Sequence, residues 1–194
     1  IVPEFSLPGH VRFNDALDAG ARGKLAPVTL GPQDIAFLQY TGGTTGVSKG
    51  ATLTHRNLVA NVLQLEAWVQ PALNDTSRGP VPEQLVYVCA LPLYHVFALT
   101  VNMLGGLRLG ALNVLIANPR DISGFANELA KYKFNVMPGV NTLFNTLAES
   151  PEFQQLDFSS LRIANGGGMA VQQAVAEKWI KLTGVPIVEG YGLS

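Results

Sequence analysis

Charged residues are scarce in this sequence. Only 14% of its 194 residues are Asp, Glu, Lys or Arg, whereas soluble domains average roughly 25%. The formal net charge is -1, and no run of Lys and Arg is present that could follow a phosphate backbone. Nucleic acid is therefore not expected as a partner. Because hydrophobic residues make up 47% of the chain, we expect further protein to cover part of its surface.

Cysteine and long apolar runs are also nearly absent. Cys89 is the only cysteine, so no intrachain disulfide can form, and its apolar surroundings, LVYVCALPL, predict a buried structural thiol. The longest apolar stretch, Val96 to Ala117, is broken by Arg108 and glycines and falls short of the ~18 apolar residues of a membrane span. No signal peptide is visible, so a cytoplasmic location is expected. No His/Cys/Asp/Glu cluster has metal-ligand spacing, so a structural zinc site is not expected.

Strand-like and helical patterns alternate along most of the chain. This alternation predicts an α/β fold with a mostly parallel sheet and helices on both faces. Residues 1–33 are expected to be irregular apart from one short helix, and residues 34–194 to form an α/β core. Thr54 or its neighbour is placed to cap the start of one helix and Asp121 that of another, and Gly184 is placed to end a helix.

Several glycine-rich or polar segments follow strand-like runs. In parallel sheets, ligands bind at the carboxyl ends of the strands. We expect residues 41–50, 92–97 and 165–169 at such positions, together with the turn at 190–194. The segment HVFALTVNMLGGLRLG (95–110) predicts one helix that is apolar on nearly every face.

The segment YTGGTTGVSKG (40–50) combines glycines and hydroxyl side chains with one lysine. It is not a P-loop, because Ser48 stands where that motif has Gly, and Gly50 stands where it has Ser or Thr. Its glycines allow successive N–H groups to converge on an anion, while the hydroxyls and Lys49 add donors and positive charge. The composition predicts a phosphate-binding loop.

The longer stretch YTGGTTGVSKGATLTH resembles the signature loop of the adenylate-forming superfamily. That superfamily includes acyl-CoA synthetases, luciferases and peptide-synthetase adenylation domains. LPLYHVFAL (91–99), NGGGMA (165–170) and GYGLS (190–194) resemble further motifs of the family in the same order. The resemblance covers essentially the whole chain and favours bacterial long-chain fatty acid–CoA ligases. It implies a fragment of the large N-terminal domain, with the acidic Mg²⁺ ligand and the mobile C-terminal domain lying beyond Ser194.

The resemblance implies that ATP and a fatty acid give an acyl-adenylate, whose acyl group then passes to coenzyme A, with Mg²⁺ as cofactor. It implies catalytic roles for Thr44, Lys49 and His95, the histidine positioning the substrate, and no metal ligand within the fragment. The implied nucleotide-binding residues are Thr41, Gly42, Gly43, Thr44, Thr45, Gly46, Lys49, Gly166, Gly167, Gly168, Tyr191, Gly192 and Ser194. The residues implied to contact the acyl substrate are His95, Val96, Phe97, Gly168 and Met169.

Several alternatives stay open at this stage. An adenylation domain that loads a carrier protein would share these motifs, and a non-catalytic nucleotide-binding module is a third class. LRIANGGGMAV has the strand–glycine–helix order of a dinucleotide fold, but the G-x-G-x-x-G pattern fails at Val171. Peripheral contact with the inner membrane is left open. The 194-residue chain by itself is not expected to complete adenylation.

Overall fold

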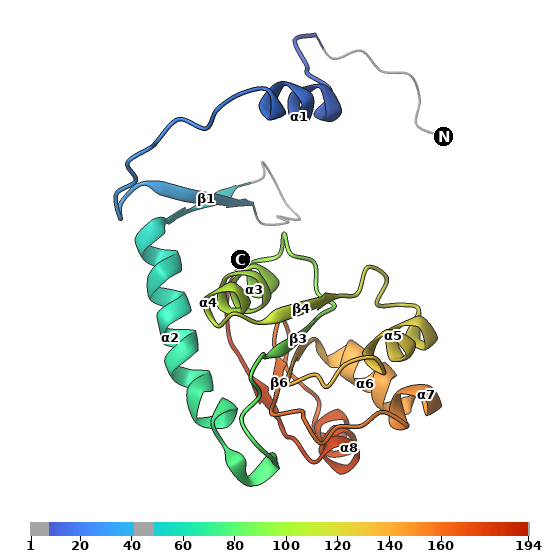
Figure 1. Ribbon diagram of the computed structural model, residues 1–194. Coiled ribbons are helices and arrows are strands. Elements are labelled where there is room, and N and C mark those ends of the chain that lie inside the picture. Colours follow the sequence, from blue (N-terminus) through green and yellow to red (C-terminus); the bar gives the residue numbers. More distant parts are fainter. Residues whose placement is uncertain (1–7, 41–48, 194) are drawn as a thin grey trace. The chain divides into compact units, whose positions relative to one another are not determined.

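The computed structural model describes residues 8–40 and 49–193. Contacts divide the chain after Gly31 into two units, which are described separately. The first unit contains helix α1 (Phe13–Ala21), whose residues are all exposed. The second unit carries the remaining elements, in which helices and strands alternate along the chain (Figure 1).

A five-stranded parallel sheet is the main framework of the second unit. Its strands lie in the order β4-β3-β5-β6-β7, and each neighbouring pair is parallel. The strands are β3 (Val86–Cys89), β4 (Leu112–Leu115), β5 (Val136–Gly139), β6 (Ile163–Gly166) and β7 (Ile187–Glu189). Because the strands are parallel, their carboxyl ends all meet at one edge. The predicted α/β fold with a mostly parallel sheet is confirmed.

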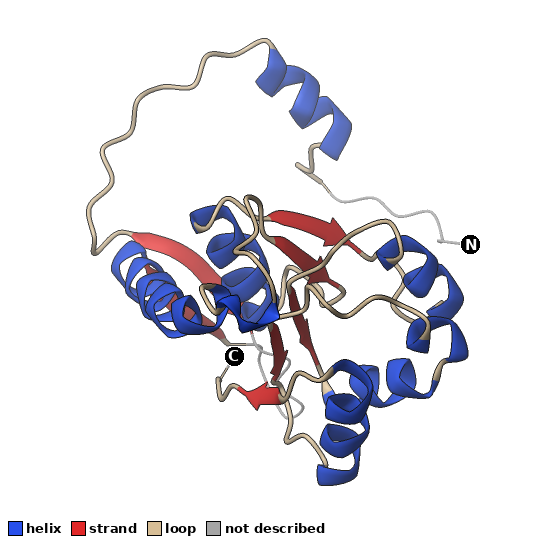
Figure 2. Ribbon diagram, turned by 60° about the horizontal axis from the view of Figure 1, so that its bottom comes forward, coloured by secondary structure: helices blue, strands red, loops and turns tan. Residues whose placement is uncertain are grey.

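Helices cover both faces of this sheet (Figure 2). On one face, Tyr87, Val136 and Ile163 pack with Val69 and Leu73 of helix α2 (His55–Leu73). The next residue along each of these strands points to the opposite face, as the two-residue period of a strand requires. The sequence pattern of nearly continuous apolar strands therefore reflects burial on both sides.

Four helices pack against the other face of the sheet. They are α5 (Ile122–Leu129), α6 (Asn141–Glu149), α7 (Pro151–Gln154) and α8 (Gln173–Thr183). Trp179 of α8 is fully buried there, with its ring centroid 4.8 Å from that of Phe144 and 5.8 Å from that of Phe153. These edge-to-face and tilted contacts bury the largest side chain of the core.

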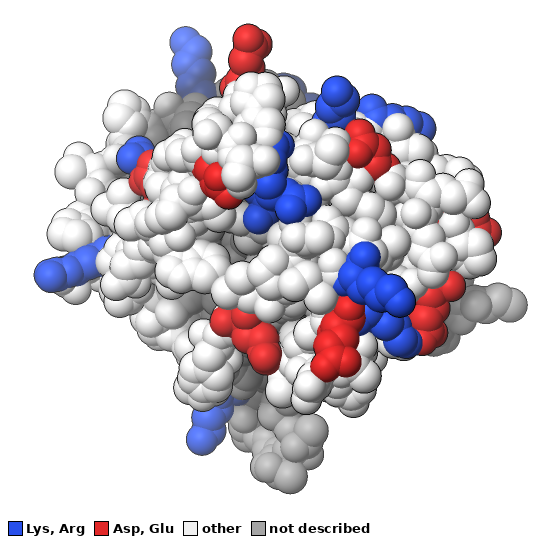
Figure 3. All heavy atoms as spheres, turned by 90° about the horizontal axis from the view of Figure 1, so that it is seen from below, with Lys and Arg blue, Asp and Glu red and all other residues white. Residues whose placement is uncertain are grey.

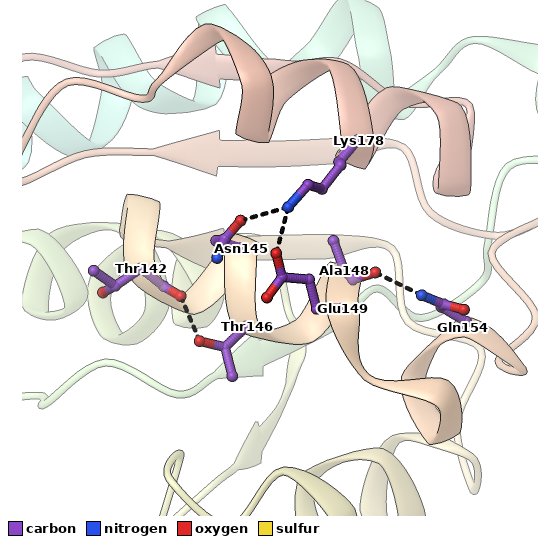
Figure 4. A network of polar contacts seen from close by, with 7 residues as sticks. All are labelled: Thr142, Asn145, Thr146, Ala148, Glu149, Gln154 and Lys178. Atoms are coloured by element: carbon purple, nitrogen blue, oxygen red, sulfur yellow. Dashed lines mark hydrogen bonds and ion pairs between the residues drawn. The ribbon is translucent and has the colours of Figure 1, made fainter.

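Polar contacts join the outer surfaces of α6 and α8. The Lys178 ammonium of α8 donates to Asn145 Oδ1 and to the Glu149 carboxylate of α6 (Figure 4). The hydrogen bond and the charge of Lys178 lower the pKa of Glu149. Because both side chains are about half exposed, the pair contributes little to stability.

The sequence predicts one helix over residues 95–110, but the middle of this segment is a π-helix and not an α-helix. The segment consists of α3 (Val96–Ala98), the π-helix η2 (Leu99–Gly105) and α4 (Gly106–Arg108). The buried Asn102 amide donates to the Val88 carbonyl at 3.0 Å, and Asn113 Nδ2 donates to the Asn102 carbonyl at 3.0 Å. These bonds fix the π-helix to β3 and β4, and apolar periodicity gives no sign of them.

The strand before residues 41–48 does not belong to the parallel sheet. β1 (Ile35–Tyr40) pairs antiparallel with β2 (Gly50–Thr54), and these two strands form a separate sheet. The prediction that residues 41–50 follow a strand of the parallel sheet is therefore wrong. Gly50 lies against the Tyr40 ring, because a Cβ at position 50 would lie 3.2 Å from it.

The three predicted helix ends are confirmed. Thr54 and Asn57 form a reciprocal capping box at the start of α2, in which Thr54 Oγ1 accepts the Asn57 N–H at 3.3 Å. Asp121 Oδ1 accepts the Gly124 N–H at 2.9 Å at the start of α5. Gly184 ends α8 with φ +70°, a backbone angle that L side chains rarely adopt.

Two arginines for which the sequence analysis predicted no role make hydrogen bonds that fix the loop after α2. Arg162 is buried and donates to the main-chain carbonyls of Asp75, Gly79 and Pro80. Arg78 donates to the carbonyls of Leu161, Thr183 and Gly184. Together they join this loop to the amino end of β6 and to the carboxyl end of α8.

The scarcity of charged residues and the single cysteine in the sequence are reflected in the structure. On the face shown in Figure 3, uncharged residues predominate and the charges of both signs are interspersed. Cys89 is buried and free, as predicted, and burial raises the pKa of its thiol. None of the helices in the described part of the chain combines the length and apolar character needed to cross a membrane.

Candidate active site

A cleft of about 650 Å³ opens at the carboxyl ends of the parallel strands. Its lining comes from β2 and α2 on one side and from residues 95–101 and 165–168 on another, with residues 189–193 completing it. The connection after β3 runs over the face that α2 covers, whereas α6 and α8, which follow β5 and β6, pack on the opposite face. Strands whose connections leave to opposite faces create a crevice at their carboxyl ends.

His95 begins the helical segment that lines this cleft. Its Nδ1 accepts the Phe97 N–H at 3.3 Å, and its own main-chain N–H donates to the Pro92 carbonyl at 2.9 Å. With Nδ1 used as an acceptor, the neutral imidazole carries its proton on Nε2. His95 therefore keeps one N–H donor for a ligand in the cleft, which suits an anionic group such as a carboxylate.

Glycines at 166 to 168 allow the turn after β6 to pack closely. Gly166 is buried, and a Cβ there would lie 2.6 Å from Val171 Cγ2 and 2.8 Å from Ile187 Cγ2. Gly168 has φ +77°, which requires glycine on backbone grounds. The main chain at this turn therefore reaches the cleft without intervening side chains.

We expect Gly167→Ala to lower the free energy of unfolding by ~1–3 kcal/mol, because the added methyl overpacks the site. A Cβ at position 167 would lie 2.9 Å from Cε1 and 3.0 Å from Cζ of the Phe97 ring. Urea-induced unfolding of the 194-residue chain measures the change. Gly192→Ala is the matched control, because a Cβ at Gly192 meets nothing within 4 Å. Equal stability of the two variants would contradict this account of Gly167.

The turn after β7 forms the outer wall of the cleft. The Gly190 N–H donates to the Gly166 carbonyl at 2.7 Å, which holds this turn against the one after β6. Tyr191 lines the cleft with 92% of its surface exposed. Glu189 also lines the cleft, and its carboxylate accepts the Val171 N–H at 3.1 Å. A broad ring face and a main-chain edge are therefore open to a planar ligand.

Helix α2 supplies a wall that the sequence analysis missed. Its cleft residues recur at helical spacing from Asn57 to Trp68 and include Asn61 and Leu65, so they extend over about 16 Å of helix. The polar asparagines lie in the first half and the apolar Leu65 and Trp68 in the second. The signal that could have identified this wall is the mixed polar and apolar stripe that these residues form along the helix.

The structure gathers only part of the predicted site. Seven predicted residues line the cleft, namely His95, Val96, Phe97, Gly167, Gly168, Tyr191 and Gly192. Gly166 lies beneath the turn, Met169 is 55% exposed beside it, and Lys49 is exposed directly before β2. The residues outside the described part of the chain are Thr41, Gly42, Gly43, Thr44, Thr45, Gly46 and Ser194.

The described residues do not fit a Mg²⁺ site. Within residues 8–40 and 49–193, no three His, Cys, Asp or Glu side chains gather in a way that could hold a metal ion.

Comparison with known proteins gives consistent matches. The family described as AMP-binding enzyme matches residues 6–194. The chain is 55% identical over 194 residues to the long-chain-fatty-acid–CoA ligase of Escherichia coli O6:H1, covering 100% of this chain and 33% of that protein. The corresponding ligase of Haemophilus influenzae is 50% identical over the same 194 residues, with 34% of its length covered.

Solved structures share the fold. The crystal structure of ATP-bound MatB from Rhodopseudomonas palustris matches with a TM-score of 0.71 and 27% identity, over 92% of this chain and 33% of that one. The chain thus spans about a third of the length of the relatives that it matches.

Proposed function

Because the chain belongs to the AMP-binding enzyme family, we propose that the enzyme containing it activates a long-chain fatty acid in two steps. First, a carboxylate oxygen of the acid bonds to the α-phosphorus of ATP while the bond to pyrophosphate breaks. Second, the sulfur of coenzyme A bonds to the acyl carbon as AMP leaves, and the thiol loses its proton. The observation that carries the proposal is the 55% identity, along the whole chain, to a protein named long-chain-fatty-acid–CoA ligase.

The nucleotide occupies the glycine-rich side of the site in this proposal. The main chain at Gly167 and Gly168 lies against adenine, and the exposed Tyr191 ring stacks on the base. Gly192 leaves space for the nucleotide, since a Cβ there would meet nothing within 4 Å apart from its chain neighbours. Ser194 would contact the α-phosphate. The phosphates are bound by the loop that contains Thr41, Gly42, Gly43, Thr44, Thr45 and Gly46, and by Lys49.

The acid occupies the side formed by α2 and residues 95–101. The Nε2–H of His95 donates to the substrate carboxylate and orients it for attack on phosphorus. A general base is not required, since a carboxylate is already ionised near pH 7. The acyl chain then lies along Leu65, Trp68 and Val101, which line the apolar part of the cleft.

We expect the full-length enzyme to prefer long acids and Val101→Trp to shift that preference to shorter ones. Val101 is half-buried and lines the cleft, so a larger side chain there removes space from the acyl chain. Each excluded methylene forfeits ~0.8 kcal/mol of burial, or about fourfold in kcat/KM. The measurement is coenzyme A ligation across acids from acetate to stearate.

Leu107→Trp serves as the matched control for Val101→Trp. Leu107 lies farther along the same helical segment, is largely exposed and does not line the cleft. The preference of Leu107→Trp for acids of different chain length should therefore equal that of the wild type. A wild type that prefers acetate or an amino acid would contradict the fatty-acid assignment. Transfer to a carrier protein in place of coenzyme A would favour a carrier-loading adenylation domain. An unchanged profile in Val101→Trp would remove this residue from the acyl site.

A further inference from the structure

Gln39 links two parts of the molecule that are far apart in the sequence. It lies near the end of β1, and its Nε2 donates to the main-chain carbonyl of Tyr94 at 3.1 Å. β1 belongs to the two-stranded sheet, whereas Tyr94 lies in the turn after β3 of the parallel sheet. This bond therefore crosses from one sheet to the other, over 55 residues of sequence.

The turn that receives this bond is held by its own hydrogen bonds and carries His95. The His95 N–H donates to the Pro92 carbonyl at 2.9 Å, and the His95 carbonyl accepts the Leu99 N–H at 2.9 Å. The ring is fixed as well, since Nδ1 accepts the Phe97 N–H. Main chain and imidazole of His95 thus move with the turn, and whatever holds Tyr94 also places His95.

The strand on the other side of the bond leads to Lys49. Gln39 pairs with Ala51 in the antiparallel ladder, and Lys49 is two residues before Ala51. The ladder is short, and the neighbouring pair Tyr40 and Gly50 closes it with the Tyr40 ring lying over Gly50. Only the pair of Tyr40 and Gly50 therefore lies between Gln39 and Lys49, the residue to which we assign the phosphate-binding charge.

We propose that Gln39 is a positioning residue that sets the placement of His95 relative to Lys49. The inference rests on the proposed function, in which these two residues act on the carboxylate and on the phosphates of one reaction. Without the amide donor, the turn and the hairpin keep their main-chain bonds but lose this connection between them, together with the 3.5 Å contact from Gln39 Nε2 to the Tyr40 carbonyl. Attack of a carboxylate on phosphorus depends on alignment, so a small misplacement slows the chemical step more than it weakens binding.

The test uses Gln39→Met in the full-length enzyme, because methionine keeps the shape and removes the donor. In fatty-acid-dependent ATP–pyrophosphate exchange, we expect kcat to fall roughly three- to tenfold, the value of one hydrogen bond. The KM values for ATP and for the acid should stay near those of the wild type. Gln173→Met is the matched control, since Gln173 Nε2 also makes a surface hydrogen bond, to Glu177 Oε1 at 2.7 Å. Its kcat should equal that of the wild type.

A second measurement separates positioning from a general structural role. If Gln39 acts through His95, Gln39→Met should have little further effect on kcat in a His95→Ala background, because the two changes are coupled. If the effects of the two substitutions on kcat are fully additive, the inference is overturned. It is also overturned if the wild type is active and Gln39→Met has the same kcat. A wild type without any fatty-acid-dependent exchange would overturn the proposed function together with the inference.

Discussion

Lys49→Met in the full-length enzyme is expected to slow acyl-adenylate formation by about 10²–10³-fold, with a much smaller effect on fatty-acid binding. The proposed reaction develops negative charge on the phosphates, and a fixed cation beside them stabilises the transition state more than the bound substrates. Lys49 is suited to this role because it is exposed directly before β2, next to the segment whose composition predicts phosphate binding. Thr44→Ala, outside the described residues, is expected to slow the same step by removing a hydroxyl donor.

ATP–pyrophosphate exchange and fatty-acid binding measured on the same variants test this expectation. Lys181→Met is the matched control, because Lys181 is also an exposed lysine but lies in the last turn of α8. Exchange at the wild-type rate in Lys49→Met would show that this lysine does not act on the phosphates. An equal loss in exchange and in fatty-acid binding would indicate damage to the fold around β2 instead.

Trp179→Ala should lower the free energy of unfolding by ~3–5 kcal/mol. Its side chain is fully buried against Phe144 and Phe153, so truncation leaves a cavity that the surrounding helices cannot fill. Since a typical domain is stable by only ~5–15 kcal/mol, the variant should unfold at a much lower urea concentration. Urea-induced unfolding of the 194-residue chain, followed by far-UV circular dichroism, measures the difference.

Trp179→Phe tests how much of the stability lost in Trp179→Ala comes from the cavity. Phenylalanine keeps an aromatic ring near Phe144 and removes the indole N–H, which is buried without a hydrogen-bond partner in the described part of the chain. We therefore expect a cost below ~1.5 kcal/mol, as for other conservative core exchanges. A loss as large as that of Trp179→Ala would show that ring shape, and not the cavity, limits stability at this position.

The sequence alone determined the features that depend on neighbouring residues. Alternating strand and helix patterns identified the α/β fold, because buried parallel strands and amphipathic helices have different periods. Thr54, Asp121 and Gly184 marked helix ends, since capping uses groups within a few residues of each other. The resemblance of four motifs pointed to the family, because a loop that binds phosphate needs glycine and hydroxyl residues at fixed spacing.

The contacts between segments that are distant in the sequence become visible only in the folded chain. Strand periodicity could not show that β1 pairs antiparallel with β2, since an apolar run has the same pattern in either sheet. Burial of Asn102 and Arg162 depends on main-chain carbonyls that are distant in the sequence. The contribution of α2 to the cleft and the contact between Gln39 and Tyr94 likewise join residues that no local pattern relates. Such contacts form when the whole chain packs, because a hydrogen bond or a cleft wall is set by distance in space and not by distance along the sequence.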